Sequence, residues 1–284
     1  MRVVAAGLFG ISLLVMVLTV ARLTSSGYAL ALVTPLLLST NVLTVPSSGA
    51  SHALSLAAAF GGVALCAWAT RFCERLLLCA VAASAAVFNF VDLLTTPAIP
   101  WALTAAVVAA ATFTRTADLR RTFWTVLFAG AVWPVAFAVT WVSRWLFAAV
   151  FLGWGPVMDN VLGIARFRVS GDHSGVSHTF GAAVARNWST WMAVPVTPAL
   201  VLVGSVVAAL VCLLLAWRRS GTTLLPAAAL LAAPALVVPA WLVVLSNHSQ
   251  IHDHFVYRTV PAALGVALAA CVLIAGRPLA PADS

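Results

Sequence analysis

Charged residues are scarce in this chain of 284 residues, and lysine does not occur at all. Charged side chains make up 8% of the sequence, against about 25% in soluble domains, while 63% of the residues are hydrophobic. This balance excludes an ordinary soluble domain. The formal net charge of +8 comes from arginines that stand singly or in pairs, mostly beside apolar runs, so it does not indicate a nucleic-acid partner.

Two further patterns are missing. The five cysteines show no C-x-x-C spacing, so we predict neither a disulfide framework nor a metal site, and we expect no cofactor. Short segments of alternating polarity, typical of membrane β-barrels, do not occur. Apolar runs near twenty residues long are present instead, and each can span a hydrocarbon core of about 30 Å. The sequence predicts an all-α, polytopic transmembrane helix bundle that forms a single integral membrane domain over residues 1–284.

The apolar runs predict about nine membrane spans, at residues 3–21, 28–45, 52–70, 76–93, 97–113, 122–143, 193–216, 223–245 and 259–276. Every second connection carries arginine, and these residues are Arg22, Arg71, Arg75, Arg115, Arg120, Arg121, Arg218, Arg219 and Arg277. By the positive-inside rule these connections face the cytoplasm of a bacterial plasma membrane. The N-terminus is then outside and the C-terminus inside, with an extracytoplasmic loop at about 154–191.

Three features refine this topology. Only Met1 and Arg2 precede the first span, which is predicted to start outside, so we expect that an N-terminal portion is missing or that the start codon is unusual. Pro134 is expected to kink the sixth span, because proline removes a helical hydrogen bond. Residues 145–158 are interpreted as an interfacial helix or as the outer end of a long tilted one. Prolines are also expected to break the seventh and eighth spans, which is tolerated beside other helices or a cavity.

The segment from Ser246 to Arg258 concentrates titratable groups between the last two spans. His248 and His252 are four residues apart, so they share one face of a helix. Asp253 and Arg258 are close enough in sequence to form an ion pair. The segment is compatible with a metal site in which His254, Asp253 or Asp92 is the third ligand, with an acid–base histidine, with anion recognition by Arg258 and Tyr257, or with a polar helix cap.

Asp92 is the one carboxylate expected near the outer end of a membrane helix, and it needs a partner such as Arg258 or Arg144 when ionised. It is a candidate general base, a cation ligand, or half of a structural ion pair. In the loop at 154–191, Arg166 and Arg168 are two residues apart. In an extended segment their side chains point the same way and can clamp a phosphate.

These segments together resemble a group of uncharacterised bacterial multi-pass membrane proteins. In that group an Asp-Leu-Thr-x-Pro stretch is followed by a tryptophan-rich, basic helix end and by a His-Ser-x-Ile-His-x-x-Phe-x-Tyr-Arg segment. The matching positions are Asp92, Thr95, Pro97, Trp141, Arg144, Trp145, His248, Ser249, His252, Phe255, Tyr257 and Arg258. The resemblance covers about residues 30–276 and implies one further span, with an extracytoplasmic region, at the N-terminus.

The general layout is similar to membrane glycosyltransferases that use polyprenyl-phosphate sugars. Those enzymes carry an acidic residue in the first outer loop, and this sequence has none there, which counts against the activity. Three hypotheses follow. The first is a glycosyltransferase-like protein acting on lipid-linked envelope glycans, which predicts that Asp92, Arg144 and His252 meet in one outward pocket with His248 and Arg258. The second is a transporter or flippase in which Asp92 and His252 relay protons at mid-membrane depth. The third is a non-catalytic scaffold. The bilayer is the expected partner, together with a polyprenyl-phosphate sugar or another anionic lipid.

Overall fold

The computed structural model describes residues 2–44, 50–92, 96–220 and 224–276, and within these ranges every regular element is helical. Thr95 and Arg277, which enter the predictions above, lie outside the described residues. Eight helical segments of the described chain are long and apolar enough to cross a membrane. They are α1 (Arg2–Leu23), α4 (Ala50–Ala69), α5 (Glu74–Val91), α6 (Ala98–Thr116), α7 (Leu119–Leu152), α10 (Thr197–Ser220), the broken segment Leu225–Val244, and Asp253–Ala275. The predicted all-α bundle is confirmed.

The second predicted span, 28–45, is shorter than expected. Its helix, α2 (Ser26–Leu38), has 13 residues, which corresponds to about 20 Å. Ser25 caps its start by accepting a hydrogen bond from the Tyr28 backbone N–H at 3.1 Å. At its end the Ser39 and Thr40 hydroxyls donate to the carbonyls of the preceding turn, at 2.6 and 2.7 Å. Hydroxyl side chains that compete for backbone carbonyls favour the end of a helix, so α2 stops before the apolar run does.

Proline divides the eighth predicted span, as the sequence indicates. Pro226 lies in the first turn of α11 (Leu225–Ala232), where its missing N–H costs nothing. Pro234 lies in a short 3₁₀ segment, η2 (Ala233–Leu236), and α12 (Val237–Val244) follows. The sixth span behaves differently, because α7 continues as one helix through Pro134 for 34 residues.

The helices α6 and α15 (Thr259–Ala275) form the centre of the bundle, and most of their residues are buried. The Tyr28 hydroxyl of α2 donates to the Ala106 carbonyl of α6 at 3.0 Å. Gly265 of α15 lies against the Leu32 carbonyl, where an added Cβ would approach to 2.3 Å. Glycine therefore permits the close contact between α2 and α15. In contrast, α7 and α10 lie at the periphery and expose most of their apolar side chains.

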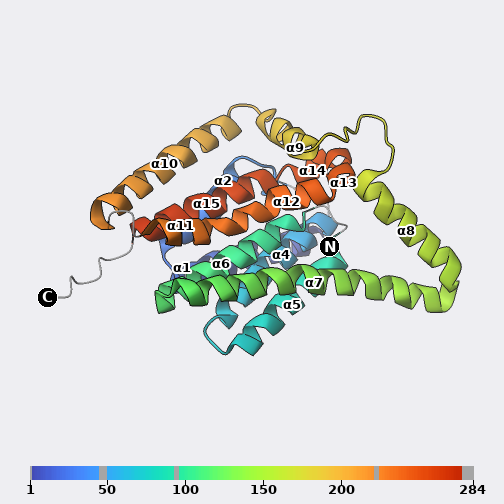
Figure 1. The fold of residues 1–284 in the computed structure, drawn as a ribbon, viewed down its shortest axis with the longest axis horizontal. Coiled ribbons are helices and arrows are strands. Elements are labelled where there is room, and N and C mark those ends of the chain that lie inside the picture. Colours follow the sequence, from blue (N-terminus) through green and yellow to red (C-terminus); the bar gives the residue numbers. More distant parts are fainter. Residues whose placement is uncertain (1, 45–49, 93–95, 221–223, 277–284) are drawn as a thin grey trace.

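The arginine-rich helix ends gather at one end of the bundle, toward the left of Figure 1. There Arg115, at the end of α6, donates to the Thr70 carbonyl after α4. Arg219, at the end of α10, donates to the Ala275 carbonyl of α15 at 2.8 Å. The alternation of basic and non-basic connections in the sequence thus corresponds to two physical ends of the molecule. Which end faces the cytoplasm stays a prediction.

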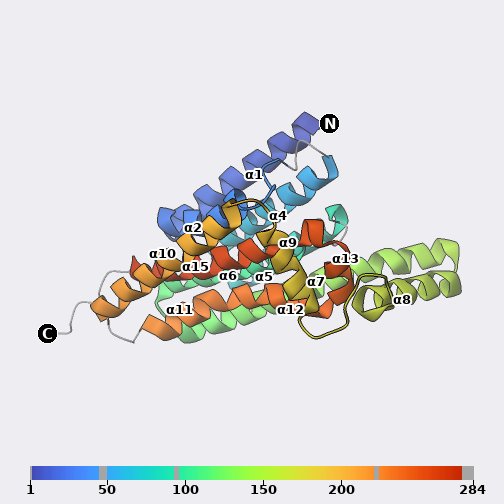
Figure 2. The same cartoon turned by 90° about the horizontal axis from the view of Figure 1, so that it is seen from above.

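The stretch 154–191 is largely helical, in contrast to the polar loop expected from the sequence. It contains α8 (Trp154–Ser170) and α9 (Ala182–Met192), which ends one residue later. Gly153, with φ of 90°, separates α7 from α8, a conformation that favours glycine. The end of α7 and all of α8 extend beyond the other helices as an arm (Figure 2). Residues 145–152 therefore form the outer end of a long helix.

Candidate functional site

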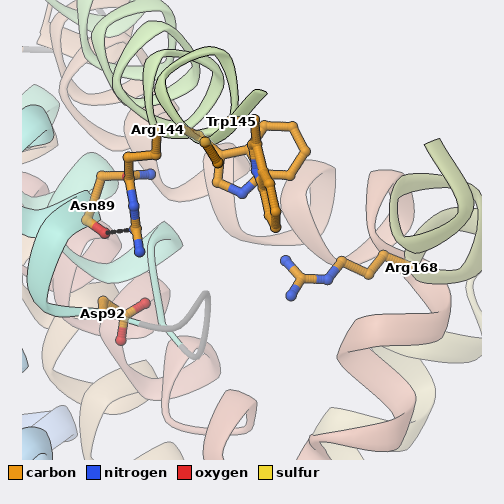
Figure 3. Close-up of a pocket in the computed structure, with 7 residues that line it drawn as sticks. Asn89, Asp92, Arg144, Trp145 and Arg168 are labelled. Atoms are coloured by element: carbon orange, nitrogen blue, oxygen red, sulfur yellow. Dashed lines mark hydrogen bonds between the residues drawn. The ribbon is translucent and has the colours of Figure 1, made fainter. Parts of the chain in front are cut away.

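A pocket of about 270 Å³ opens between the end of α5, the outer part of α7 and α8. Figure 3 shows two guanidinium groups and one carboxylate around it, from three different elements. Its lining residues are Asn89, Asp92, Trp141, Arg144, Trp145, Ala148 and Arg168. Three residues predicted from the sequence, Asp92, Arg144 and Arg168, therefore line one cavity.

Asp92 is the C-cap residue of α5, and its side chain is buried with 4% of the residue exposed. Its backbone N–H donates to the Phe88 carbonyl at 2.9 Å, which closes the last turn of the helix. Its Oδ2 accepts a hydrogen bond from the Thr96 N–H at 3.4 Å. The carboxylate is thus held where α5 leaves the bundle and the chain turns toward α6.

Asn89, one turn before Asp92, links α5 to α7. The side-chain Nδ2 of Asn89 donates to the Phe137 carbonyl at 3.3 Å, and the backbone carbonyl of Asn89 accepts from Arg144 Nη1 at 3.2 Å. The Arg144 guanidinium also lies 5.7 Å from the centre of the Phe90 ring, within cation–π range. These contacts fix the Arg144 side chain across the mouth of the pocket. Asn89 was not among the residues predicted from the sequence, although its position three residues before Asp92 on a helix was a usable signal.

Arg168 enters the pocket from the opposite side, from the last turn of α8. Its Nη1 is buried and has no hydrogen-bond partner among the described residues. Burial lowers the pKa of this guanidinium, because desolvation penalises the charged form. An arginine remains protonated in proteins all the same, so a buried donor without an acceptor favours an anionic ligand.

Arg166 does not share this pocket. The two arginines lie on a helix rather than in an extended segment, and residues two apart on a helix point to different sides. Arg166 is exposed, whereas Arg168 is half-buried in the pocket wall. Arg166 and Arg168 therefore do not line one cavity together, and Arg168 shares its pocket with Arg144 instead.

The histidine segment folds into α13 (Ser246–Ile251) and α14 (Asp253–Val256). The rings of His248 and His252 are 4.7 Å apart, so the predicted shared face is confirmed. His248 is buried and His252 is half-buried. The pKa of His252 is lowered by burial first, and then by the positive fields of His254 and Arg168. Neither His248 nor His252 lines the pocket that holds Asp92, Arg144 and Arg168.

Asp253 pairs with α9 rather than with Arg258, so that predicted ion pair is wrong. Its Oδ2 accepts from Arg186 Nε at 2.5 Å and from the Thr190 hydroxyl at 3.0 Å. Arg186 and Thr190 lie one turn apart on α9, and both donate to the Asp253 carboxylate of α14. The ion pair ties α9 to the histidine segment.

Arg258 and Tyr257 point to a different place from the pocket. Arg258 Nε donates to Asn41 Oδ1 at 2.8 Å, and the Tyr257 hydroxyl donates to the same oxygen at 3.1 Å. Only 3% of Arg258 is exposed, and its guanidinium lies 5.3 Å from the centre of the Phe255 ring. Asn41, just beyond α2, replaces Asp92 as the hydrogen-bond partner of Arg258. Asn41 was not among the residues predicted from the sequence.

Amide side chains hold the α8–α9 region over the histidine segment. Asn247 Nδ2 donates to the Phe167 carbonyl at 2.9 Å and also to the Gly171 carbonyl. The Gln250 side chain accepts from the Ser177 N–H at 3.0 Å and donates to the Ser177 carbonyl at 2.9 Å. The polar residues around the histidines thus position the end of α8, from which Arg168 reaches the pocket.

A metal centre finds no support in the described part of the chain, where no group of three or more His, Cys, Asp or Glu side chains comes together. Two of the residues considered as a third metal ligand lie in different places: Asp92 lines the pocket, while Asp253 forms an ion pair with α9. The arrangement is suited to holding an anion beside a carboxylate.

The sequence matches no protein-family model, and no curated protein and no solved structure matches the chain. No relative therefore assigns a role to Asp92, Arg144 or Arg168. The fold by itself shows the class of the protein. The chain is a polytopic helical membrane protein whose apolar outer surface contacts the lipid bilayer.

Proposed function

We propose that this membrane protein binds the phosphate of a polyprenyl-phosphate-linked sugar in the pocket between α5, α7 and α8, and transfers the sugar at the outer face of a bacterial plasma membrane. One observation carries the proposal. Arg168 presents a buried Nη1 without a hydrogen-bond partner among the described residues, in a cavity that Arg144 lines from α7. Two guanidiniums converging on one cavity are typical of phosphate recognition.

The tryptophans of the pocket support a lipid-linked ligand over a soluble one. Trp141 and Trp145 are one turn apart on α7, and their rings are 6.0 Å apart in an edge-to-face arrangement. Tryptophan and arginine on the same helix face are typical of the headgroup layer of a membrane. A sugar ring can stack on such an aromatic surface while the lipid chain remains in the bilayer.

In the proposed reaction Asp92 accepts the proton of an acceptor hydroxyl. The hydroxyl oxygen forms a bond to the anomeric carbon of the sugar, and the bond from that carbon to the phosphate oxygen breaks. The electron pair leaves with the polyprenyl phosphate, whose added negative charge Arg144 and Arg168 stabilise. Burial and the positive fields of His254 and Arg168 lower the pKa of His252, which favours its neutral, proton-accepting form.

The transporter hypothesis has less support. A proton relay needs ionisable groups at mid-membrane depth. In the described spans the Asp, Glu, His and Arg side chains lie toward the two ends of the bundle. A scaffold role does not account for the unsatisfied Arg168 donor. We therefore prefer the transferase.

Binding of a short-chain polyprenyl phosphate to the protein in lipid nanodiscs tests the first step. Arg144→Ala and Arg168→Ala are each expected to weaken binding about tenfold or more, because each removes a hydrogen bond to a charged group. Arg166→Ala is the matched control, since Arg166 lies two residues from Arg168 on the same helix and outside the pocket. Equal losses in Arg166→Ala and Arg168→Ala would contradict the proposal.

A comparison of envelope glycolipids in cells with and without the gene tests the reaction. The transferase predicts that one glycolipid loses a sugar and that its unmodified precursor accumulates. Unchanged glycolipids together with altered uptake or export would contradict the transferase and favour transport.

A further inference from the structure

A second pocket, of about 220 Å³, lies at the opposite end of the bundle, among the arginine-rich helix ends. It is formed where α4 ends, α5 begins, α6 ends and α7 begins. Its lining residues are Thr70, Phe72, Cys73, Glu74, Leu77, Thr112, Arg115, Arg121, Trp124 and Thr125. The proposed transfer reaction makes no use of this pocket.

Two guanidinium groups dominate its charge. No carboxylate of the described residues lies within ion-pair distance of Arg115 or Arg121. Arg115 donates one N–H to the Thr70 carbonyl, which leaves further donors of its five for a ligand. Glu74 also lines the pocket, so the lining carries two positive charges and one negative charge. The net field favours an anion.

A buried hydroxyl adds a second, independent sign of a ligand. Thr112 is 1% exposed, and its Oγ1 has no hydrogen-bond partner among the described residues. It lines the pocket from the same helix as Arg115, one turn earlier. Leaving such a buried hydroxyl unsatisfied is unfavourable, and a phosphate oxygen that accepts its hydrogen bond would offset this cost.

The walls of the pocket are suited to a lipid rather than to a free anion. Phe72 and Trp124 are 50% and 46% exposed although they are large and apolar. The Phe72 ring lies 4.6 Å from that of Trp68, and the Trp124 ring lies 5.3 Å from that of Phe123. Exposed aromatic pairs beside arginines mark the boundary between headgroups and acyl chains.

The position of the pocket along α7 agrees with this boundary. At about 1.5 Å per residue, Arg121 and Arg144 lie roughly 35 Å apart on the helix. A bilayer has a hydrocarbon core of about 30 Å, with headgroups on both sides. If Arg144 lies in one headgroup layer, Arg121 lies in the other.

We propose that this second pocket binds the phosphodiester headgroup of an anionic phospholipid from the leaflet opposite to the first pocket. Arg115 and Arg121 hold the phosphate, the Thr112 hydroxyl donates to one of its oxygens, and the acyl chains lie against Phe72 and Trp124. Basic pockets between membrane helices recognise anionic lipids in this way. The proposal does not depend on the transfer reaction.

Native mass spectrometry of the detergent-solubilised protein with added phosphatidylglycerol or phosphatidylcholine tests the proposal. We expect phosphatidylglycerol to be retained more strongly than phosphatidylcholine, and Arg121→Gln to reduce its retention about fivefold. Arg120→Gln is the matched control, because Arg120 is the adjacent exposed arginine and does not line the pocket. It is expected to change retention less than twofold.

Glu74→Gln provides a test in the other direction. Removing the one negative charge of the lining should increase the retention of phosphatidylglycerol, so the proposal remains testable if Arg121→Gln fails to fold. Equal retention of the two lipids, equal losses in Arg120→Gln and Arg121→Gln, or no gain in Glu74→Gln would each overturn it. Displacement of the lipid by millimolar inorganic phosphate would assign the pocket to a free anion and would also overturn it.

Discussion

The two ends of the bundle use arginine differently. At the arginine-rich end Arg115 and Arg121 are exposed and line an open pocket among short helix connections. At the other end Arg168 and Arg258 are partly or fully buried, and asparagines, a carboxylate and histidines surround them. Exposed arginines at a lipid surface act mainly through charge. Buried arginines require specific acceptors, and this difference is the reason to expect chemistry at only one end.

The histidines are also distributed unequally between the two ends of the bundle. The chain has six histidines, and all of them lie at the Asp92 end. His52 at the start of α4 contacts Phe255, with ring centres 5.0 Å apart, and His173 and His178 lie in the segment before α9. The imidazole groups of the chain are therefore concentrated at this end.

The largest expected effect comes from Asp92. If this end is the reactive one, Asp92→Asn should lower kcat/KM for sugar transfer by at least about 100-fold, because it removes the general base. Binding of the polyprenyl phosphate should weaken little, since both arginines remain. Asp172→Asn is the control, because Asp172 is fully exposed at the same end. Similar transfer rates in the two variants would remove the catalytic distinction between the ends.

Stability should also differ between the ends. Asn247→Ala removes two hydrogen bonds to backbone carbonyls at a fully buried position, and it should lower the free energy of unfolding by about 1–3 kcal/mol. Arg115→Gln at the other end removes one part-buried hydrogen bond, from an exposed side chain, and should lower the free energy of unfolding by less. Thermal unfolding in detergent measures both, and hydrogen exchange should show faster exchange in α8 for Asn247→Ala alone. Uniform exchange changes over the whole bundle would contradict a local role for Asn247.

The smallest expected effect is a pH dependence confined to one end. The pKa of His252 is lowered from its ordinary value of 6.5, so protonation is less favourable in the folded state. The contribution of His252 to the free energy of unfolding is then constant above pH 6.5. It falls as the pH decreases from 6.5 through the lowered pKa. His252→Asn should reduce this loss of stability, as measured by unfolding midpoints between pH 7.5 and 5. His173→Asn, at an exposed position, should retain the wild-type dependence.

Much of the fold could be predicted from the sequence, because spans and arginine positions are properties of local composition. Eight of nine predicted spans correspond to helices of the described chain that are long enough to cross a membrane. The exception, at 28–45, shows the limit of a hydropathy pattern. Hydroxyl side chains at Ser39 and Thr40 end the helix although apolar residues continue.

The candidate site was predicted in part. Asp92 and Arg144 are visible as charges at the end of apolar runs, and both line the pocket. The partnership of Arg144 with Arg168 could not be predicted, since it depends on α8 folding back after Gly153. The position of Arg258 depends on Asn41, which lies more than two hundred residues away in the chain.

The sequence by itself determined that the chain is a helical membrane protein and that its polar and basic residues are divided between the helix ends. Hydrophobic length and charge decide this, because each helix must satisfy its own backbone in lipid. Only the tertiary structure decided which of those charges meet. Arg168 lines one pocket with Asp92 and Arg144, while Arg166, Tyr257 and Arg258 do not line it, because helix phase and the angle between α7 and α8 set the direction of each side chain.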